Sequence, residues 1–358
     1  MTEIEPSAAA AESRNGKREF DHLRVDDFLK TLLDARSLST AFRIGLVDLL
    51  LEKGTATGRQ LEEQCGAESG GMDLLLNLLA ANGAVEDRNG VFTLSGNFLR
   101  ALQYRDLLEL KIDLCHFAAC DLLDCFDLLI CDPGRFMKEA RTYRLFSYER
   151  CGEDTEENRL RTERWMRITT ILTKYEAQAC LARHDFGSFR RLLDIGGNSG
   201  EFALQVCRAH PRLTATVLDL PVVCRIGKEH VRRSPEADRI AFVEGNALVD
   251  PLPAGHDIVV FKSVLHDWPE PAAAELLSRA YGCLAPGGTL LVFERGPAEI
   301  GTAVPAFSAI PFFLFHHSFR SPAFYADHLG GLGATEVRIR RVDLEMPFFL
   351  VTARKAFP

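Results

Sequence analysis

The sequence lacks any apolar stretch long enough to cross a bilayer, which takes about 20 residues in a helix. Its N-terminus, MTEIEPSAAAAESRNGKREF, also lacks the order of basic and then apolar residues that marks a signal peptide. We therefore expect a cytoplasmic protein with no membrane partner, and a disordered lead-in over residues 1–17.

Clustered positive charge and closely paired cysteines are missing as well. Lys and Arg number 42 against 50 Asp and Glu, a net charge of −8, and a phosphate-rich partner needs grouped basic side chains. We therefore expect no nucleic-acid partner. The ten cysteines form no CxxC pair, which argues against zinc and disulfides and for reduced, buried thiols. Several lie in apolar surroundings: Cys115, Cys120, Cys125, Cys180 and Cys207.

The apolar residues that are present, 47% of 358, can fill the cores of two domains. Residues 18–100 show short helical patterns and then two apolar runs around a turn at 87–90, which predicts a hairpin. Three helices and a hairpin are typical of a winged helix, which either reads DNA or dimerises. The expected recognition helix, residues 70–83, has no Lys or Arg, so we expect a dimerisation domain.

Residues 101–185 are almost wholly helical in pattern, and we expect them to form a linker and the roof of an acceptor pocket. Aromatic and polar residues interleave over residues 141–150, which fits such a roof and equally fits a solvated face. Candidate acceptor contacts from this region are Tyr143, Arg144 and Met166.

From residue 186 to residue 358 short β-rich runs alternate with helical runs, which predicts a Rossmann-like, doubly wound parallel sheet. The fold class is therefore α/β, with an N-terminal helical, winged-helix-like domain. In such sheets ligands bind beyond the carboxyl ends of the strands. Five expected strands end in or lead to polar or glycine-rich motifs there: DIGGNSG (194–200), DLP (219–221), EGN (244–246), FKSVLHDW (261–268) and LAPGGTLLVFERGP (284–297).

Each motif suits one part of a nucleoside ligand. The small residues after the first strand let the backbone approach a ligand closely. A carboxylate at Asp219 can accept two hydrogen bonds from ribose hydroxyls, and Gly245 and Asn246 lie where an adenine could be held. Together with their order and spacing, these motifs over residues 190–298 resemble a class I SAM-dependent methyltransferase of the caffeate/hydroxyindole O-methyltransferase type.

The resemblance implies S-adenosyl-L-methionine (SAM) as cofactor, S-adenosyl-L-homocysteine (SAH) as product, a small-molecule acceptor and a homodimer formed through the N-terminal domain. It implies His266 as general base, with Asp267 and Glu294 beside it, and no metal. The implied cofactor-binding residues are Asp194, Gly196, Gly197, Gly200, Asp219, Leu220, Asn246 and Lys262.

Three residues depart from the family pattern. Asn198 replaces a glycine, which is mild because Asn tolerates left-handed backbone. Asn246 replaces an aspartate, and its amide oxygen can still accept a hydrogen bond from an adenine amino group. Phe319 stands about where the family has a second glutamate that orients the base, so the base loses one of its two acids.

The segment around Phe319 carries cations instead of an acid, which suits an acceptor with a carboxylate. A thioether sulfur needs no base, only positioning and desolvation. S-methylation of a thioether hydroxy acid such as 4-methylthio-2-hydroxybutyrate, on the route to dimethylsulfoniopropionate, therefore stands level with O-methylation. Further acceptor contacts are expected from Trp268, His316, His317 and Arg320, although the last three could also lie in solvent.

Other hypotheses remain. His266, Asp267 and His317 could hold iron for C-methylation of a 2-oxo acid, since two histidines and a carboxylate form a known facial set. A winged-helix regulator that senses SAM is a second class, but it would need a basic helix. A catalytically dead interaction protein is disfavoured because Lys262, His266 and Glu294 are retained.

Overall fold

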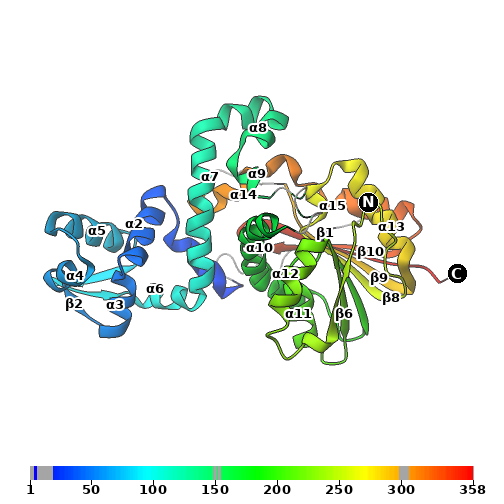
Figure 1. Cartoon of the computed structure of the whole chain (residues 1–358), viewed down its shortest axis with the longest axis horizontal. Coiled ribbons are helices and arrows are strands. Elements are labelled where there is room, and N and C mark those ends of the chain that lie inside the picture. The colour runs from blue at the N-terminus through cyan, green and yellow to red at the C-terminus, as the bar shows by residue number, and fades with distance from the viewer. Residues whose placement is uncertain are drawn as a thin grey trace. The chain divides into compact units, whose positions relative to one another are not determined.

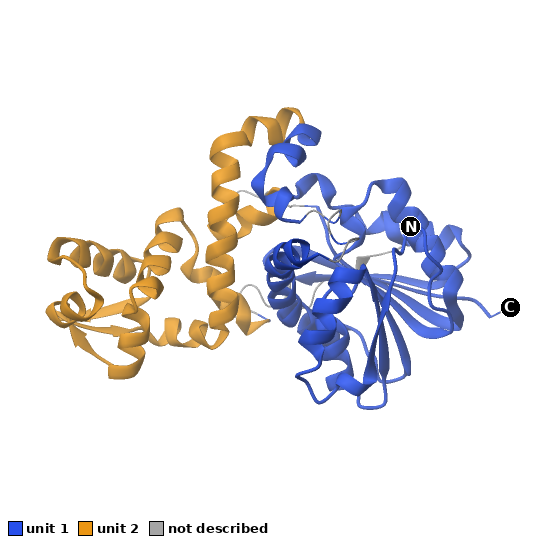
Figure 2. Cartoon of the chain, viewed as in Figure 1, with its two compact units in different colours: residues 1–19, 133–299, 315–358 blue, residues 20–132, 300–314 orange. Residues whose placement is uncertain are grey.

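The structure is a computed structural model in which residues 4–5, 19–146, 148, 151, 155–297 and 306–357 are described. The chain forms two compact units (Figure 2). Unit 1 comprises residues 1–19, 133–299 and 315–358, and unit 2 comprises residues 20–132 and 300–314. Of the lead-in predicted over residues 1–17, only Ile4–Glu5 is described, as the short strand β1.

Unit 2 begins with short helices and a small sheet. Two helices start at capping boxes, Thr31 with Asp34 and Thr57 with Gln60, in which each side chain satisfies a free backbone N–H of the other residue. The predicted hairpin is present, and its turn residues Asn89 and Gly90 have φ of 57° and 81°. The elements are η2 (Asp21–Phe28), α2 (Leu32–Arg43), α3 (Leu46–Lys53), α4 (Gly58–Cys65), α5 (Ser69–Ala81), and the sheet β2 (Ala56–Thr57), β4 (Val91–Leu94), β3 (Val85–Arg88) in that order.

The rest of unit 2 is built on the long helix α7 (Arg105–Cys131), which is kinked at Cys125. A buried ion pair between Lys111 of α7 and Asp26, 2.8 Å long, fixes this helix to η2. The remaining elements are α6 (Gly96–Ala101), η3 (Leu102–Tyr104), η7 (Phe307–Ala309) and α14 (Ile310–Phe313).

Unit 1 contains the predicted doubly wound sheet, so the fold class is confirmed (Figure 1). The strand order is β1-β10-β11-β9-β8-β5-β6-β7, and β11 alone of these described strands runs antiparallel to its neighbours. The strands are β5 (Arg191–Ile195), β6 (Thr214–Asp219), β7 (Ile240–Glu244), β8 (His256–Lys262), β9 (Leu284–Arg295), β10 (Thr335–Asp343) and β11 (Pro347–Arg354).

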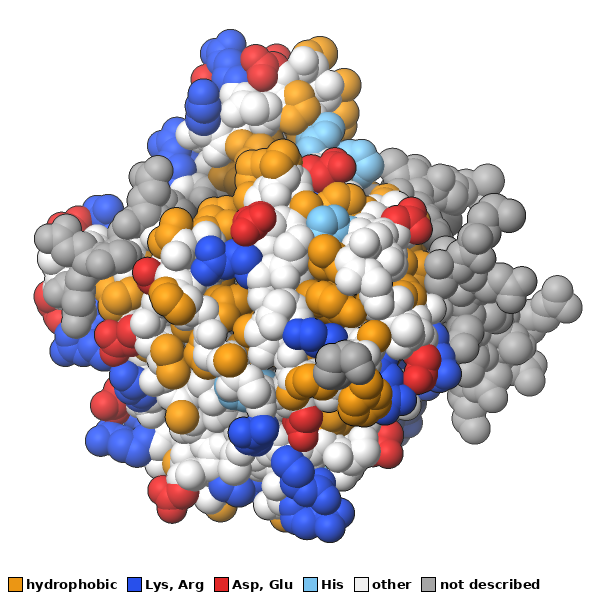
Figure 3. All heavy atoms as spheres, turned by 90° about the vertical axis from the view of Figure 1, so that its right-hand side faces the viewer, with side chains coloured by type: hydrophobic (Ala, Val, Ile, Leu, Met, Phe, Trp, Pro, Cys, Tyr) orange, Lys and Arg blue, Asp and Glu red, His pale blue; other side chains and the backbone are white. Residues whose placement is uncertain are grey.

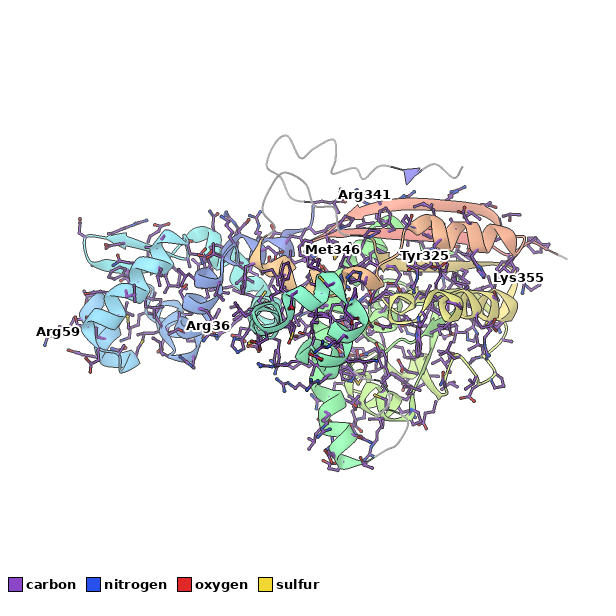
Figure 4. All side chains as sticks on the ribbon, turned by 90° about the horizontal axis from the view of Figure 1, so that it is seen from above. Arg36, Arg59, Tyr325, Arg341, Met346 and Lys355 are labelled. Atoms are coloured by element: carbon purple, nitrogen blue, oxygen red, sulfur yellow. The ribbon has the colours of Figure 1, made fainter. Side chains whose placement is uncertain are left out.

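Helices cover both faces of this sheet. Leu193 and Ile195 of β5 join an apolar cluster with α13 and α15, whereas their neighbours Leu192 and Asp194 are buried on the other face. Tyr325 of α15 lies in that cluster (Figure 4). The helical elements are α8 (Pro133–Glu139), α9 (Arg141–Leu145), α10 (Glu156–Arg183), α11 (Glu201–Ala209), α12 (Pro221–Val231), η5 (Ala237–Arg239), η6 (Leu265–Asp267), α13 (Glu270–Cys283), η8 (His316–Ser318) and α15 (Pro322–Gly331).

The surface and the thiols agree with the composition. Basic and acidic side chains are interspersed on the described part of the face in Figure 3, without a broad basic area. All ten cysteines are free, and five of them are buried. Among the described residues, no helix combines the length and the apolar character that a membrane span requires.

Candidate active site

The turn after β5 has a backbone that only small or adaptable residues can follow. Gly196, Asn198 and Gly200 have φ of 68°, 56° and 74°. A Cβ on Gly196 would lie 2.9 Å from Cγ2 of Val264, so a side chain there would force that residue to move. Asn198 tolerates its left-handed conformation, as its replacement of glycine requires.

Beneath this turn lies a carboxylate with an unsatisfied oxygen. Asp194 is 1% exposed, and its Oδ2 has no hydrogen-bond partner among the described residues. A Cβ on Gly197 would lie 2.6 Å from that atom. Burial, reinforced by the charge of Asp219, raises the pKa of Asp194 to about 7. Buried polar groups normally have partners, so this carboxylate fits the amino group of SAM.

Asp219, at the end of β6, is oriented by the backbone around it. Oδ2 accepts a hydrogen bond from the N–H of Asn198 and Oδ1 accepts one from the N–H of Leu220, each 2.8 Å long. Burial raises the pKa of Asp219 to about 6, against the opposing effect of these two bonds. Each oxygen keeps a lone pair for a ribose hydroxyl, so Asp219 fits the role expected of it.

Helix α10 is bonded to the same turn. Thr169 Oγ1 donates to Asn198 Oδ1 over 3.2 Å, and Thr170 Oγ1 donates to Ser199 Oγ over 2.8 Å. Asn198 therefore does more than replace a glycine: it connects the turn to α10 through its side chain and to Asp219 through its backbone.

The structure gives Asn246 and Lys262 partners that the sequence did not indicate. Asn246 Oδ1 accepts the backbone N–H of Leu248 over 3.0 Å, and its second lone pair and the amide NH₂ remain as groups to offer an adenine. Lys262 Nζ donates to Thr173 Oγ1 over 2.8 Å and forms an ion pair with Glu176 of α10. The charges of Arg295 and Lys262 outweigh the effect of burial and lower the pKa of Glu176 to about 2. No motif pointed to Glu176.

His266 is oriented by Glu294, as predicted. Its Nδ1 lies 2.7 Å from Oε2 of Glu294, which is 1% exposed. The other oxygen of Glu294 accepts the backbone N–H groups of Val264 and Leu265, over 2.6 and 2.7 Å. Because the carboxylate can only accept, Nδ1 carries the proton and Nε2 is left to act as a base.

A second carboxylate lies beside Nε2. Asp267 Oδ1 is 3.3 Å from this nitrogen, and Asp267 Oδ2 accepts the hydroxyl of Tyr148 over 2.6 Å. Burial alone would lower the pKa of His266, but the charges of Asp267 and Glu294 outweigh it, so the pKa is raised. Burial also raises the pKa of Asp267, against the charge of His266 and the hydrogen bond from Tyr148.

Aromatic side chains gather around this network. The ring of Phe319 lies 5.4 Å from His266, so an apolar ring occupies the place of the family's second glutamate. Tyr148 stacks on Trp268 with centroids 6.2 Å apart and meets Trp165 edge-on at 5.7 Å. Trp268 was expected here, and Tyr148 belongs to the segment 141–150 that was predicted as a possible pocket roof, whereas no motif marks Trp165.

Tyr143 and Met166, two of the acceptor contacts predicted from the helical region, lie in this apolar environment. Met166 is 2% exposed and belongs to the cluster that contains Trp165. Tyr143 contacts Phe315 with ring centroids 4.7 Å apart, and burial raises its pKa to about 12.

The cations proposed as carboxylate ligands make other contacts. Arg320 donates to the carbonyl oxygen of Leu265, over 2.7 Å, and to that of Trp268. Arg144 donates to two carbonyl oxygens at the end of α8, of which the closer, Glu139 O, is 2.8 Å away. His316 and His317 are exposed. Arg320 therefore holds the backbone on both sides of His266, a role that the linear sequence did not indicate.

Replacing Arg320 with alanine should loosen the His266 turn and lower kcat by about tenfold, because His266 would be held less well in its reactive position. KM should change equally for acceptors with and without a carboxylate, as steady-state kinetics with both types will show. A rise in KM confined to carboxylate acceptors would instead place Arg320 against the acceptor.

The proposed iron ligands do not come together. No group of three or more His, Cys, Asp or Glu side chains in the described part of the chain is arranged to hold a metal ion. His266 is committed to Glu294, and His317 is exposed.

The protein has a doubly wound sheet. The ends of its strands carry a glycine-rich turn, an aspartate suited to bind ribose hydroxyls, and a histidine bonded to a carboxylate. This combination defines a class I SAM-dependent methyltransferase. Comparison with known proteins supports this class: residues 133–303, a little under half of the chain, match a family model described as the O-methyltransferase domain. The protein is therefore a SAM-dependent methyltransferase.

Relatives agree with this assignment. The chain is 26% identical over 279 residues to 3-hydroxy-5-methyl-1-naphthoate 3-O-methyltransferase of Streptomyces sahachiroi, which covers 75% of this chain and 76% of that protein. Mitomycin 7-O-methyltransferase MmcR is 25% identical, with a TM-score of 0.66 over 98% of both chains. Human N-acetylserotonin methyltransferase, solved with SAM, shares the fold at 22% identity, a TM-score of 0.61, and 96% and 99% coverage of the two chains. The predicted cofactor is confirmed.

Proposed function

We propose that the protein methylates a hydroxyl group on an aromatic small molecule, with His266 as the base. The observation that carries this proposal is the bond between His266 and Glu294, which leaves Nε2 free to take a proton. SAM supplies the electrophilic methyl group. As the acceptor oxygen bonds to that methyl group and the sulfur–carbon bond breaks, the O–H proton passes to Nε2 and SAH remains.

Oxygen is favoured over sulfur because this base is fully built. A thioether needs no base, whereas Glu294 is buried and bound by two backbone N–H groups so that it can orient His266. A thioether hydroxy acid would also need a cation for its carboxylate, and Arg320 is occupied by backbone carbonyls. S-methylation therefore has less support than the sequence suggested.

An aromatic acceptor is favoured by the side chains near His266. Tyr148, Trp268 and Phe319 offer ring faces and edges, which bind planar molecules well. They also exclude water, which strengthens the charge interactions around the reacting oxygen. The Streptomyces relative acts on a hydroxynaphthoate, an acceptor of this class.

The rate of methylation should rise with pH through the pKa of His266, which lies above the usual 6.5. Only the neutral imidazole can accept the proton, so protonation below this pKa removes activity. The test is SAH release, measured against pH, across hydroxyarenes, thioether hydroxy acids and 2-oxo acids. A thioether acceptor turned over at a rate independent of pH would contradict the proposal.

We also propose that the protein is a homodimer formed through unit 2. Helix α7 exposes Leu123, Phe126 and Ile130, which are 83%, 53% and 65% exposed. Phe126 and Ile130 are four residues apart beyond the kink at Cys125 and so share one side of the helix, and a second copy of the chain would bury them together with Leu123.

Replacing Phe126 with aspartate should then convert the dimer into a monomer, because a charge would have to be buried at the contact. Analytical ultracentrifugation will measure the change, with the exposed Asp113 changed to asparagine as a control on the same helix. A Phe126→Asp protein that sediments like the unchanged dimer would remove this side of α7 from the interface.

A further inference from the structure

Tyr148, a described residue from outside the motifs, bonds through its hydroxyl to Asp267, the acid beside His266. Its hydroxyl donates to Asp267 Oδ2 over 2.6 Å, and Asp267 Oδ1 lies 3.3 Å from His266 Nε2. The linear order of the residues does not indicate this contact, since Tyr148 and Asp267 are 119 residues apart.

The tyrosine ring is held independently of its hydroxyl. It stacks on Trp268, with an interplanar angle of 18°, and meets Trp165 at 89°. Burial and the charge of Asp267 raise the pKa of Tyr148 well above its usual value. The hydroxyl is therefore a neutral donor throughout the working pH range, fixed in direction by the two tryptophans.

The family pattern has a second acid that orients the base, and this chain has Phe319 in its place. In the structure, Asp267 lies beside His266 as a second acid. Asp267 has its side chain 22% exposed, so it contacts both Nε2 and solvent. The other charged or titratable groups that act on His266 or Asp267 come from β9, from the segment before α15 and from α9: Glu294, Arg295, Arg320 and Tyr143.

We propose that Tyr148 is a positioning residue of the base, which holds Asp267 against His266 Nε2 so that Asp267 returns the proton to solvent between turnovers. This inference rests on the proposed function. Once the methylated product has left, the Nε2–H bond breaks and an O–H bond forms on Asp267 Oδ1. Asp267 then gives this proton to a water molecule, and His266 is neutral again for the next acceptor.

Replacing Tyr148 with phenylalanine keeps the ring and removes the hydroxyl. Without that donor the carboxylate of Asp267 binds a proton more readily. The same carboxylate also stabilises protonated His266 more strongly. The pair of residues therefore keeps its proton up to a higher pH. The acid limb of the kcat/KM profile should move up by about half a unit to one unit, a threefold to tenfold change in the protonation equilibrium. Affinity for SAM should stay the same.

Three variants sharpen the experiment. Tyr281→Phe, a hydroxyl removed from α13 beside Lys355, should leave the profile unchanged. Asp267→Asn should move the limb down, because it removes a charge that raises the pKa of His266. The double variant Tyr148→Phe with Asp267→Asn should match Asp267→Asn alone. The proposal would be overturned if the acid limb of the kcat/KM profile lay at the same pH in Tyr148→Phe and in the unchanged protein. It would also be overturned if the limb of the double variant differed from that of Asp267→Asn.

A readout without an acceptor separates this inference from the proposed function. Nitrogen-15 NMR of labelled histidine gives the pKa of His266 directly, with its signal assigned by its loss in His266→Gln. The pKa should rise in Tyr148→Phe whether or not any hydroxyarene is methylated. If hydroxyarenes fail as acceptors and this rise is seen, the proposed function alone is wrong. If the pKa does not move, the role of Tyr148 is wrong.

Discussion

Replacing His266 with alanine should lower kcat by about 10²- to 10⁴-fold, the usual contribution of a general base. The acceptor hydroxyl would then have to lose its proton to water, while Glu294 would keep its bonds to the backbone N–H groups of Val264 and Leu265. The affinity for SAM, measured by calorimetry, should be unchanged, because the hydrogen bond of His266 goes to Glu294 and the residues that fit SAM are held by other bonds.

His116, exposed on α7, gives the matched control: His116→Ala should keep full activity. A His266→Ala enzyme that retains most of its activity would show that the acceptor atom needs no base, as a thioether sulfur does not. That result would restore S-methylation and end the case for oxygen.

Replacing Asp219 with alanine should weaken SAM binding by at least about 100-fold. The carboxylate offers both ribose hydroxyls a charged acceptor, and each such hydrogen bond contributes about 1.5–3 kcal/mol. The same carboxylate accepts the N–H groups of Asn198 and Leu220, so its loss also frees the turn that surrounds the cofactor. Calorimetric titration with SAM and with SAH will measure the effect.

Because Asp219 also bonds to the backbone, its loss could affect folding. The thermal unfolding of the variant must therefore be measured alongside that titration. Asp238→Ala, in η5, is the control and should bind SAM as the unchanged protein does. A folded Asp219→Ala protein with nearly normal affinity for SAM would show that the ribose lies elsewhere, and the assignment of the turn after β5 would fail with it.

The sequence was informative about the sheet and its strand ends. Alternating β-rich and helical runs from residue 186 gave the doubly wound fold, and short motifs gave the positions of Asp194, Asp219 and His266. These features follow from local patterns, since a glycine turn or an acid that ends a strand needs only its neighbours in the chain. The bond between His266 and Glu294 was equally foreseeable, because His266 closely follows β8 and Glu294 lies at the end of the adjacent parallel strand β9.

The packing of side chains from distant segments was not foreseeable. Arg320 was expected to meet an acceptor and instead bonds to the backbone around His266. Glu176 pairs with Lys262, and Glu176 is 119 residues from its other partner, Arg295. Nothing in the linear order of the chain specifies which of several cations will meet which carboxylate.

What the sequence by itself determined, then, was the fold of the C-terminal part and the cofactor, and it singled out the histidine that we propose as the base. What only the tertiary structure decided was the setting of that base: Tyr148 on Asp267, Phe319 on His266 and Arg320 on the turn between them. The physical reason is that turns and strand ends are fixed by short-range sterics and hydrogen bonds. Contacts between segments far apart in the chain are fixed by how the segment after α9, helix α10 and the segment before α15 pack around the strand ends.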